Sequence, residues 1–375
     1  MSDQAVLFPL ESTNFMSESP TNSCPAPNLD YQPRDPKSYH PGIGLIGCGA
    51  ITQDHLTAYR DAGYQVVALC DRDLSRAKQR QIDYFPAAKV FESYTDLLAY
   101  DNVAVVDITT HPPERPPIIE AALSADKHVL SQKPFVLDLD EGLRLVELAE
   151  ERSLHLAVNQ NGRWAPHFSY MRAANSAGLL GELSGIHLSV HWDHSWVEGT
   201  EFAKIHHLIL YDYAIHWFDM VTCLMGDRPA LRVYASAVQS ASQTIGPPLL
   251  GQAMIEYENG QASLSFDAHT KFGEQDRSLI TGSKGTISSV GPGNKIQTLT
   301  LTTADGTCQP HLEGSWFPDG FHGTMGELLC SIEQNRRPSI DARRNLNSLA
   351  LCFAAVASAD HHEPVVPGTV RQIPQ

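Results

Sequence analysis

Paired cysteines, long apolar runs and an N-terminal basic stretch are all missing from this sequence. Its 375 residues include seven scattered cysteines and no Cys-x-x-Cys pair. This excludes a cysteine-bound structural zinc and a disulfide framework, and it indicates reduced thiols. No apolar run approaches the length of a membrane span, and the first residues lack the basic region and apolar core of a secretory signal. We therefore expect a cytoplasmic protein without a membrane partner.

Positive charge is also scarce. The chain has 27 lysines and arginines against 43 aspartates and glutamates, which gives a formal net charge of −16. Such a charge opposes binding to the phosphate backbone of nucleic acids, so we expect no nucleic-acid partner. Hydrophobic residues make up 42% of the sequence, and the mean hydropathy is −0.22. A chain of this length and composition can form two globular domains with a large core.

The stretch from Pro41 to Asp71 has the layout of a dinucleotide-binding strand–helix–strand unit. An apolar strand runs into Gly47-Cys48-Gly49, a helix follows, and a second apolar strand ends at Asp71, 22 residues after Gly49. Glycine allows the tight turn and the close approach of the backbone to a pyrophosphate, which the N–H groups at the start of the helix would bind. We expect the phosphate contacts to come from Gly47, Gly49, Ala50 and Ile51.

Asp71 also bears on the choice of coenzyme. At this spacing an acid accepts hydrogen bonds from the adenosine ribose and repels a 2′-phosphate, so we expect NAD. Arg72 and Arg76 follow closely and could hold that phosphate, which leaves NADP as the alternative. The third small position of the motif is Thr52 instead of glycine or alanine, so the helix needs slightly more room beside the strand.

Strand and helix patterns alternate from residue 41 to residue 160. Apolar, β-branched runs predict strands at 42–47, 65–70, 89–91, 103–108, 127–131 and 154–159, with helical periods between them. Continuous runs of this kind are typical of parallel strands that are buried on both faces. Residues 41–160 are therefore predicted to form an α/β Rossmann domain with a doubly wound parallel sheet.

The pattern changes after residue 160. Helices are predicted at 166–177, 208–224, 323–334 and 346–360, with a strand at 181–190 and a run of strands from 230 to 301. This predicts a second, α+β domain over residues 161–375, with a large open and mainly antiparallel sheet. Residues 1–40 are rich in proline and show neither pattern. They form either a disordered tail or an extended arm on a neighbouring subunit.

Two places carry residues suited to proton transfer. Lys133 follows a strand of the first domain, and ligands bind at the carboxyl ends of strands in doubly wound sheets. On the predicted helix 208–224, Asp212, His216 and Asp219 share one face. A carboxylate then lies beside an imidazole, as a general acid–base requires. The alternatives are a surface lysine and a polar helix face whose hydrogen bonds are satisfied internally.

A third region, between residues 187 and 207, is rich in histidine and tryptophan. Such rings suit a wall that stacks on a sugar and hydrogen-bonds its hydroxyls, with His194, His206 and His207 as the candidates. A metal site built from His191, His194 and His207 is the alternative. No His-x-x-x-His pair lies on a predicted helix, so we favour the absence of a metal.

Together these features resemble the Gfo/Idh/MocA family, which includes glucose–fructose oxidoreductase and inositol dehydrogenase. The resemblance covers residues 42–366 and rests on the glycine turn, the Asp-x-x-x-His pattern of residues 212–216 and the segments 127–134, 161–166 and 282–286. It implies a Rossmann domain followed by an α+β domain whose open sheet carries a homo-oligomer interface, in a dimer or tetramer. The proline-rich arm is similar to the one that covers a neighbour's cofactor in glucose–fructose oxidoreductase.

The resemblance also implies an activity, the NAD(P)-dependent interconversion of a secondary alcohol and a ketone on a sugar, glycoside or cyclitol. His216 would exchange the hydroxyl proton, Lys133 would polarise the reacting oxygen, and Asp212 would orient the substrate and the histidine. The same resemblance places further residues near the two ligands. These are Thr110, His111, Gln132 and Lys133 at the cofactor, and Arg163 and Trp164 beside the substrate with the three histidines.

This sequence departs from the family pattern at two positions. Gln132 stands where glutamate is usual, and Pro116 replaces a histidine that the family often has. A second enzyme class stays open, because some relatives use transient oxidation at a ring carbon to drive elimination. This would be a redox-assisted lyase, glycosidase or hydratase with tightly bound NAD, with or without a metal. A third alternative is a non-catalytic sensor of nucleotide redox state, which the presence of Lys133, Asp212 and His216 opposes.

Overall fold

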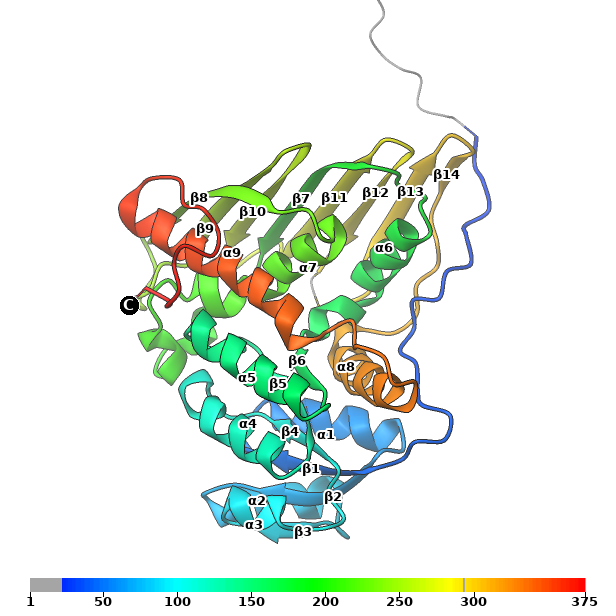
Figure 1. The fold of residues 1–375 in the computed structure, drawn as a ribbon. Coiled ribbons are helices and arrows are strands. Elements are labelled where there is room, and N and C mark those ends of the chain that lie inside the picture. The colour runs from blue at the N-terminus through cyan, green and yellow to red at the C-terminus, as the bar shows by residue number, and fades with distance from the viewer. Residues whose placement is uncertain (1–21, 293, 375) are drawn as a thin grey trace, which may run out of the picture.

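The computed structural model describes residues 22–292 and 294–374, which form two β-sheets with helices packed between them (Figure 1). The lower sheet in that view comes from residues 42–159 and the upper sheet from residues 183–308. Within the described part of the chain, no helix is both long and apolar enough to span a membrane. All seven cysteines are free.

The first sheet is parallel and confirms the predicted Rossmann domain. Its strands are β1 (Gly42–Ile46), β2 (Gln65–Cys70), β3 (Lys89–Phe91), β4 (Val105–Ile108), β5 (His128–Gln132) and β6 (Leu156–Asn159). They are arranged in the order β3-β2-β1-β4-β5-β6, so the chain reverses direction across the sheet between β1 and β4. Ligands bind at this switch point in doubly wound sheets, beyond the carboxyl ends of the strands.

Helices cover this sheet, and three of them begin at polar caps. They are α1 (Thr52–Asp61), α2 (Leu74–Tyr84), α3 (Tyr94–Leu98), the 3₁₀ turn η1 (Pro112–Glu114), α4 (Arg115–Ser124) and α5 (Leu139–Glu151). Asp73, Ser93 and Asp138 accept hydrogen bonds from backbone N–H groups at the starts of α2, α3 and α5. These caps satisfy donors that would otherwise have no partner at a helix end.

The second sheet is open and has eight strands. They are β7 (Leu183–His191), β8 (Ala230–Val238), β9 (Leu250–Tyr257), β10 (Gly260–Asp267), β11 (Gln275–Gly282), β12 (Gly285–Gly291), β13 (Thr298–Thr303) and β14 (Gly306–Cys308). Their order is β14-β13-β12-β11-β7-β10-β9-β8, and every neighbouring pair is antiparallel except β7 and β10. The predicted mainly antiparallel sheet is therefore confirmed.

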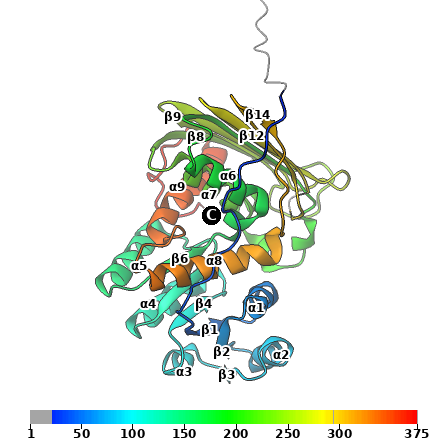
Figure 2. The same ribbon diagram turned by 90° about the vertical axis from the view of Figure 1, so that its right-hand side faces the viewer.

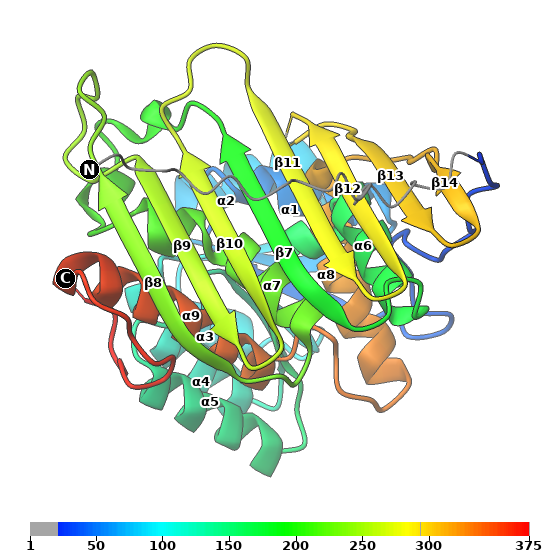
Figure 3. The same cartoon turned by 90° about the horizontal axis from the view of Figure 1, so that it is seen from above.

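The remaining helices lie on one face of this sheet. They are η2 (Asn161–Trp164), α6 (Pro166–Ser176), η3 (Ser195–Val197), η4 (Glu201–Lys204), the π-helical turn η5 (Ile209–Tyr213), α7 (Ile215–Met225), α8 (Trp316–Glu333) and α9 (Ala342–His361). Seen from above, the outer face of the sheet carries no helix (Figure 3).

Two helix predictions need correction. The predicted helix 208–224 is divided into η5 and α7, because the N–H groups of Tyr213 and Ala214 bond to carbonyls five residues earlier. The predicted helix 323–334 instead begins at Trp316. The added residues contain Pro318 and Gly320, residue types that disfavour a helix.

Residues 22–40 lie extended along their own chain, past α6 and α8 towards β1 (Figure 2). Tyr170 and Ser169 of α6 donate hydrogen bonds to carbonyls of this segment, and Glu333 of α8 accepts from backbone N–H groups of residues 37–39. Residues 22–40 are thus ordered on their own chain instead of forming a disordered tail, and a contact of this segment with a neighbouring subunit stays a prediction. Residues 1–21 of the predicted arm lie outside the described residues.

Candidate active site

Gly47 and Gly49 form the turn between β1 and α1 at the centre of the first sheet. Gly47 has a φ of 97°, and a Cβ atom there would lie 3.0 Å from Thr109 Oγ1, so this position requires glycine. No heavy atom lies within 4 Å of the place where a Cβ of Gly49 would stand, which leaves room for a phosphate. Thr52 fits the third small position because its hydroxyl donates to Gly47 O at 2.9 Å.

Asp71 lies beside this turn, as predicted. Its carboxylate accepts hydrogen bonds from Cys48 N at 2.7 Å and from Asp73 N at 2.8 Å, which leaves acceptor positions for ribose hydroxyls. The side chain of Arg72 is exposed and pairs with Glu114 at 2.8 Å. The glycine turn and the acid therefore fit a dinucleotide, with Ala50 and Ile51 at the start of α1 within the same turn.

Arg115, at the start of α4, fixes the segment that carries Lys133. Its buried guanidinium donates hydrogen bonds to the carbonyls of Thr110, Gln132, Lys133 and Pro134. Burial lowers the pKa of Arg115 to about 10, so the group stays charged at neutral pH. One cation thus holds four carbonyl oxygens at the carboxyl ends of β4 and β5.

The side chain of Gln132 belongs to a buried polar network. Its Nε2 lies 3.1 Å from His55 Nε2, and His55 Nδ1 lies 2.7 Å from Asp107 Oδ2. Asn159 Nδ2 also approaches His55 Nε2, at 3.2 Å, so the ring donates from Nδ1 and accepts at Nε2. Gln132 Oε1 accepts from Lys133 N at 2.7 Å. A carboxylate at position 132 could not donate to His55, which explains the glutamine.

Lys133 extends from β5 to the turn before α7. Its Nζ donates to Asp212 O at 3.0 Å and lies 3.5 Å from both carboxylate oxygens of Asp212. His216 is buried in the first turn of α7, and burial together with the charge of Lys133 holds its pKa well below the ordinary value. The imidazole is therefore neutral at physiological pH and able to accept a proton.

Aromatic packing holds His216 in place. Trp316 lies edge-on to the imidazole with centroids 5.3 Å apart, and its Nε1 donates to Asn161 Oδ1 at 2.9 Å. A Cβ atom at Gly162 would stand 3.4 Å from His216 Nδ1. This nitrogen is buried without a hydrogen-bond partner among the described residues, so Nε2 is the nitrogen left for a ligand.

Asp276 of β11 provides a pH-dependent test of this region. Trp192, which packs 6.0 Å from Trp316, donates to Asp276 Oδ1 at 2.6 Å, but burial dominates and raises the pKa of Asp276 to about 8. The folded protein therefore holds a proton that the unfolded chain releases, and stability falls as pH rises from about 4 to 8. We expect Asp276→Asn to gain about 1.4 kcal/mol of unfolding free energy over wild type for each pH unit in that window.

Urea unfolding of both proteins between about pH 5 and pH 8 measures this gain. Asp305→Asn, in the exposed turn between β13 and β14, is the control for an aspartate-to-asparagine change outside the buried region. If the Asp276→Asn difference did not vary with pH, Asp276 would not hold the extra proton.

Two family descriptions match the chain. The model described as "Oxidoreductase family, NAD-binding Rossmann fold" matches residues 42–160, and the "GFO/IDH/MocA C-terminal domain" model matches residues 168–288. The chain belongs to the Gfo/Idh/MocA family. It is therefore an oxidoreductase with an NAD-binding Rossmann domain, and the resemblance inferred from its motifs is confirmed.

Two relatives of this Gfo/Idh/MocA protein are dehydrogenases by name. D-apiose dehydrogenase of Paraburkholderia graminis is 27% identical over 334 residues, which covers 84% of this chain and 86% of the relative. Inositol 2-dehydrogenase of Rhizobium meliloti is 24% identical over 324 residues, or 84% of this chain and 96% of the relative.

Solved structures share the fold. One is an oxidoreductase from Agrobacterium radiobacter in complex with NAD⁺, L-tartaric acid and magnesium. Its TM-score is 0.78 at 22% identity, and the match covers 88% of this chain and 99% of the oxidoreductase chain. Another is the WlbA dehydrogenase from Bordetella pertussis in complex with NADH and UDP-GlcNAcA. Its TM-score is 0.71 at 22% identity, and the match covers 91% of this chain and 99% of the WlbA chain.

In this family member, His194 lies near the catalytic candidates Lys133 and Asp212. Its ring packs 4.6 Å from Tyr213, and its Nδ1 accepts from Trp196 Nε1 at 3.1 Å. Burial lowers the pKa of His194 to about 4; the nearby charge of Asp212 opposes this and the charge of Lys133 adds to it. The imidazole is therefore neutral at physiological pH, and its contact with substrate stays a prediction.

Thr110 and His111 follow β4, at the same edge of the sheet as the glycine turn. Thr110 Oγ1 is buried without a hydrogen-bond partner among the described residues. The exposed ring of His111 packs 5.8 Å from Phe202, which in turn lies 5.8 Å from Trp196. The contact of Thr110 and His111 with the cofactor therefore stays a prediction.

The structure places Arg163 and Trp164 in packing roles. Arg163 is buried in a bidentate ion pair with Asp219, which turns Asp219 away from the proton-transfer role that a shared helix face had suggested. Trp164 is buried, and a Cβ atom at Gly323 of α8 would stand 2.1 Å from its ring. Both side chains are thus engaged within the protein, which argues against the predicted contact with substrate.

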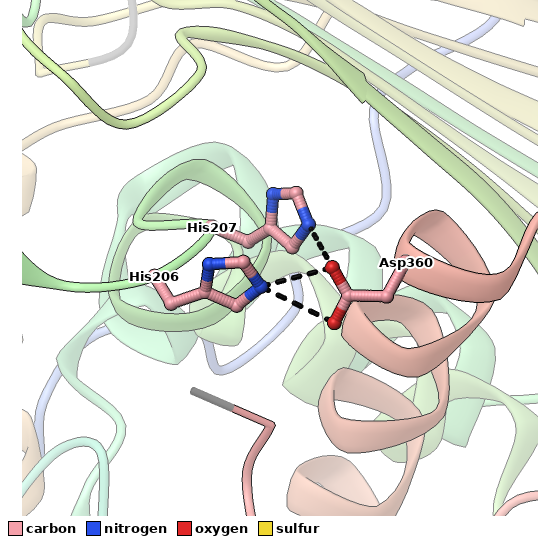
Figure 4. Close-up of side chains that lie close together, drawn as sticks. All are labelled: His206, His207 and Asp360. Carbon is pink, nitrogen blue, oxygen red and sulfur yellow. Dashed lines mark hydrogen bonds and ion pairs between the residues drawn. The ribbon is translucent and has the colours of Figure 1, made fainter.

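His206 and His207 face α9 instead of Lys133. Both imidazoles approach the carboxylate of Asp360 (Figure 4). The predicted metal set of His191, His194 and His207 is not brought together, because His207 meets Asp360 while His194 contacts Trp196. The sequence did not indicate Asp360, which lies 153 residues beyond His207.

Proposed function

We propose that this protein is an NAD-dependent dehydrogenase that oxidises a secondary alcohol of a sugar or cyclitol to a ketone. The observation that carries the proposal is the meeting of Lys133, Asp212 and a neutral, buried His216 at the edge of an NAD-binding domain. The names of the relatives, D-apiose dehydrogenase and inositol 2-dehydrogenase, support a polyhydroxylated substrate. No observation favours redox-assisted elimination.

The residues divide the chemistry between them. His216 Nε2 takes the hydroxyl proton while the carbon–oxygen bond becomes a carbonyl, and the Lys133 ammonium donates a hydrogen bond to the same oxygen, where negative charge develops. Asp212 holds Lys133 in position through its backbone carbonyl and its carboxylate. Bound NAD⁺ would supply the acceptor for the hydride that leaves the carbinol carbon.

A substrate panel tests this proposal. Purified protein is mixed with NAD⁺ or NADP⁺ and with single polyols, among them myo-inositol, D-apiose, pentoses and hexoses, and absorbance of the reduced nicotinamide is followed. We expect turnover of at least one polyol with NAD⁺. Thermal stabilisation by NAD⁺ without oxidation of any polyol would overturn the assignment as a dehydrogenase and leave only the nucleotide-binding role.

The preference for NAD is expected to depend on Asp71. Asp71→Asn keeps an acceptor for Cys48 N but removes the charge that repels a 2′-phosphate. We expect the ratio of kcat/KM for NAD⁺ over NADP⁺ to fall by about tenfold, which corresponds to roughly 1.4 kcal/mol. Asp73→Asn, two residues away and exposed, is the matched control. An unchanged ratio in Asp71→Asn would show that another group selects the coenzyme.

The uncovered sheet face also supports a homo-oligomer. Large apolar side chains project from several of its strands and are exposed in the single chain, namely Val238, Met254, Leu279 and Val290. These side chains lie on a sheet face that no helix covers, so another protein surface could bury them. We propose that a second copy covers this face, as expected from the family resemblance. Light scattering on the purified protein should give a dimer or tetramer mass, and a monomer would contradict this assembly.

A further inference from the structure

A histidine–histidine–aspartate cluster lies between the segment before η5 and the last turn of α9 (Figure 4). His206 Nε2 lies 2.9 Å and 3.2 Å from the two carboxylate oxygens of Asp360, and His207 Nε2 lies 2.8 Å from Oδ1. One ligand atom from each residue falls within 4.8 Å of the other two. The three side chains therefore converge on one point.

The backbone is strained where the two histidines meet this point. Neighbouring residues of an extended chain direct their side chains to opposite sides. His207 has a φ of 45°, in the left-handed region that residues other than glycine rarely adopt. This conformation accompanies two adjacent imidazoles that face the same carboxylate, an arrangement that two ordinary surface histidines would not need.

The contacts of Asp360 already bring together the atoms that a metal ion would bind. Its carboxylate faces Nε2 of His206 and Nε2 of His207, so one oxygen ligand and two nitrogen ligands lie side by side. A metal ion binds imidazole nitrogens and carboxylates in their deprotonated forms. Its binding would therefore release the protons that now bridge the histidines and Asp360.

We propose that His206, His207 and Asp360 bind one divalent cation of the borderline transition series, with Zn²⁺ as its representative. Two nitrogen ligands and one carboxylate match the preference of Zn²⁺, Co²⁺ and Ni²⁺, whereas Mg²⁺ and Ca²⁺ prefer oxygen ligands. Ligand distances of about 2.0–2.2 Å require the nitrogen–oxygen separations to widen by roughly half an ångström. His206 and Asp360 are partly exposed, so they can move and leave a position for water.

The cation would brace the active site without touching substrate. The carbonyl of His207 accepts hydrogen bonds from the N–H groups of Leu210 and Tyr211, the two residues that immediately precede Asp212. Tyr211 packs against Phe353 of α9, and Asp360 lies seven residues further along that helix, about 10 Å along its axis. The site therefore ties the turn that carries Asp212 to the end of α9.

Metal titration of untagged, chelator-treated full-length protein tests the proposal. Isothermal titration should show one saturable Zn²⁺ site per chain and none for Mg²⁺ or Ca²⁺, and Zn²⁺ should raise the Tm by several degrees. Co²⁺ should give the visible absorption of a low-coordinate complex with nitrogen and oxygen ligands. These readouts do not depend on catalysis, so they stand apart from the proposed dehydrogenase activity.

Variants locate the ion. His206→Asn and Asp360→Asn should each weaken Zn²⁺ binding at least about tenfold. The matched control is His322→Asn, which removes a histidine that pairs at 2.8 Å with a single carboxylate, Asp35. His206 is partly exposed, so its variant should fold, and circular dichroism checks this. The proposal is overturned if the wild type shows no saturable Zn²⁺ site, or if the folded variants bind Zn²⁺ as the wild type does.

Discussion

Replacing His216 by asparagine should lower kcat for polyol oxidation by about 10²–10⁴-fold, the contribution of a positioned general base. His216 is buried beside Trp316, and its pKa is held well below the ordinary histidine value, first by burial and then by the charge of Lys133. The neutral ring is thus ready to accept the hydroxyl proton. NAD⁺ should still stabilise the variant against heat, because His216 is not part of the glycine turn.

The pH profile gives a second readout of this residue. Because the pKa of His216 is lowered, kcat/KM for oxidation should persist as pH falls through the range where an ordinary histidine becomes protonated. Lys133→Met removes one of the two influences that lower this pKa. The pKa of His216 should therefore rise, and the acid limb of any residual activity should lie at higher pH than in the wild type.

A matched control separates chemistry from packing. His167 of α6 is also buried, and its Nδ1 has no hydrogen-bond partner among the described residues. His167→Asn should therefore lower the Tm but keep kcat within a few fold. If His216→Asn kept most of its kcat, or if both variants lost activity equally, His216 would not be the proton acceptor.

The Rossmann domain was predictable because its strands carry their signal locally. A run such as Val105–Ile108 is apolar enough to mark a parallel strand buried on both faces, and the glycine turn marks where the sheet meets a ligand. Asp107 inside this run was not predicted as a buried partner of His55. The two residues lie 52 positions apart, and no local pattern encodes such a pair.

The contacts within the candidate site could be predicted only in part, for the same reason. Lys133 and His216 stand in recognisable segments, but nothing in the sequence singled out Arg115, around which the fold brings four carbonyls. Helical periodicity placed Asp212 and Asp219 on one face. The π-helical turn η5 changes the register before α7, so Asp212 meets Lys133 while Asp219 meets Arg163.

Replacing Asp219 by asparagine should destabilise the protein by about 3–5 kcal/mol. Asp219 is fully buried, and its two oxygens accept from Arg163 at 2.6 and 2.8 Å, with a further bond from Ser348 at 3.0 Å. Burial alone would lower the pKa of Arg163, but the Asp219 carboxylate outweighs it and raises the pKa. The variant would thus bury a guanidinium charge without its counter-ion.

Urea unfolding measures this loss, and an exposed ion pair provides the comparison. Glu120 accepts from Arg144 at 2.9 Å, but both side chains are about half exposed. Glu120→Gln should therefore cost less than about 1 kcal/mol, because solvent screens a surface pair. A similar small cost for Asp219→Asn would show that water or a side-chain rearrangement compensates the buried arginine.

The same variant should also change the active site. Arg163 follows Gly162, the residue against which His216 packs, so a loosened Arg163 lets water reach the imidazole. Better solvation raises the low pKa of His216 towards its ordinary value. At a temperature where Asp219→Asn is still folded, the acid limb of its kcat/KM profile should therefore lie at higher pH than in the wild type.

Glu120→Gln should leave the profile unchanged, because that surface pair has no contact with the 161–164 segment. If the profile shifts in Asp219→Asn but not in Glu120→Gln, the ion pair between Asp219 and Arg163 influences the pKa of His216 as well as stabilising the fold.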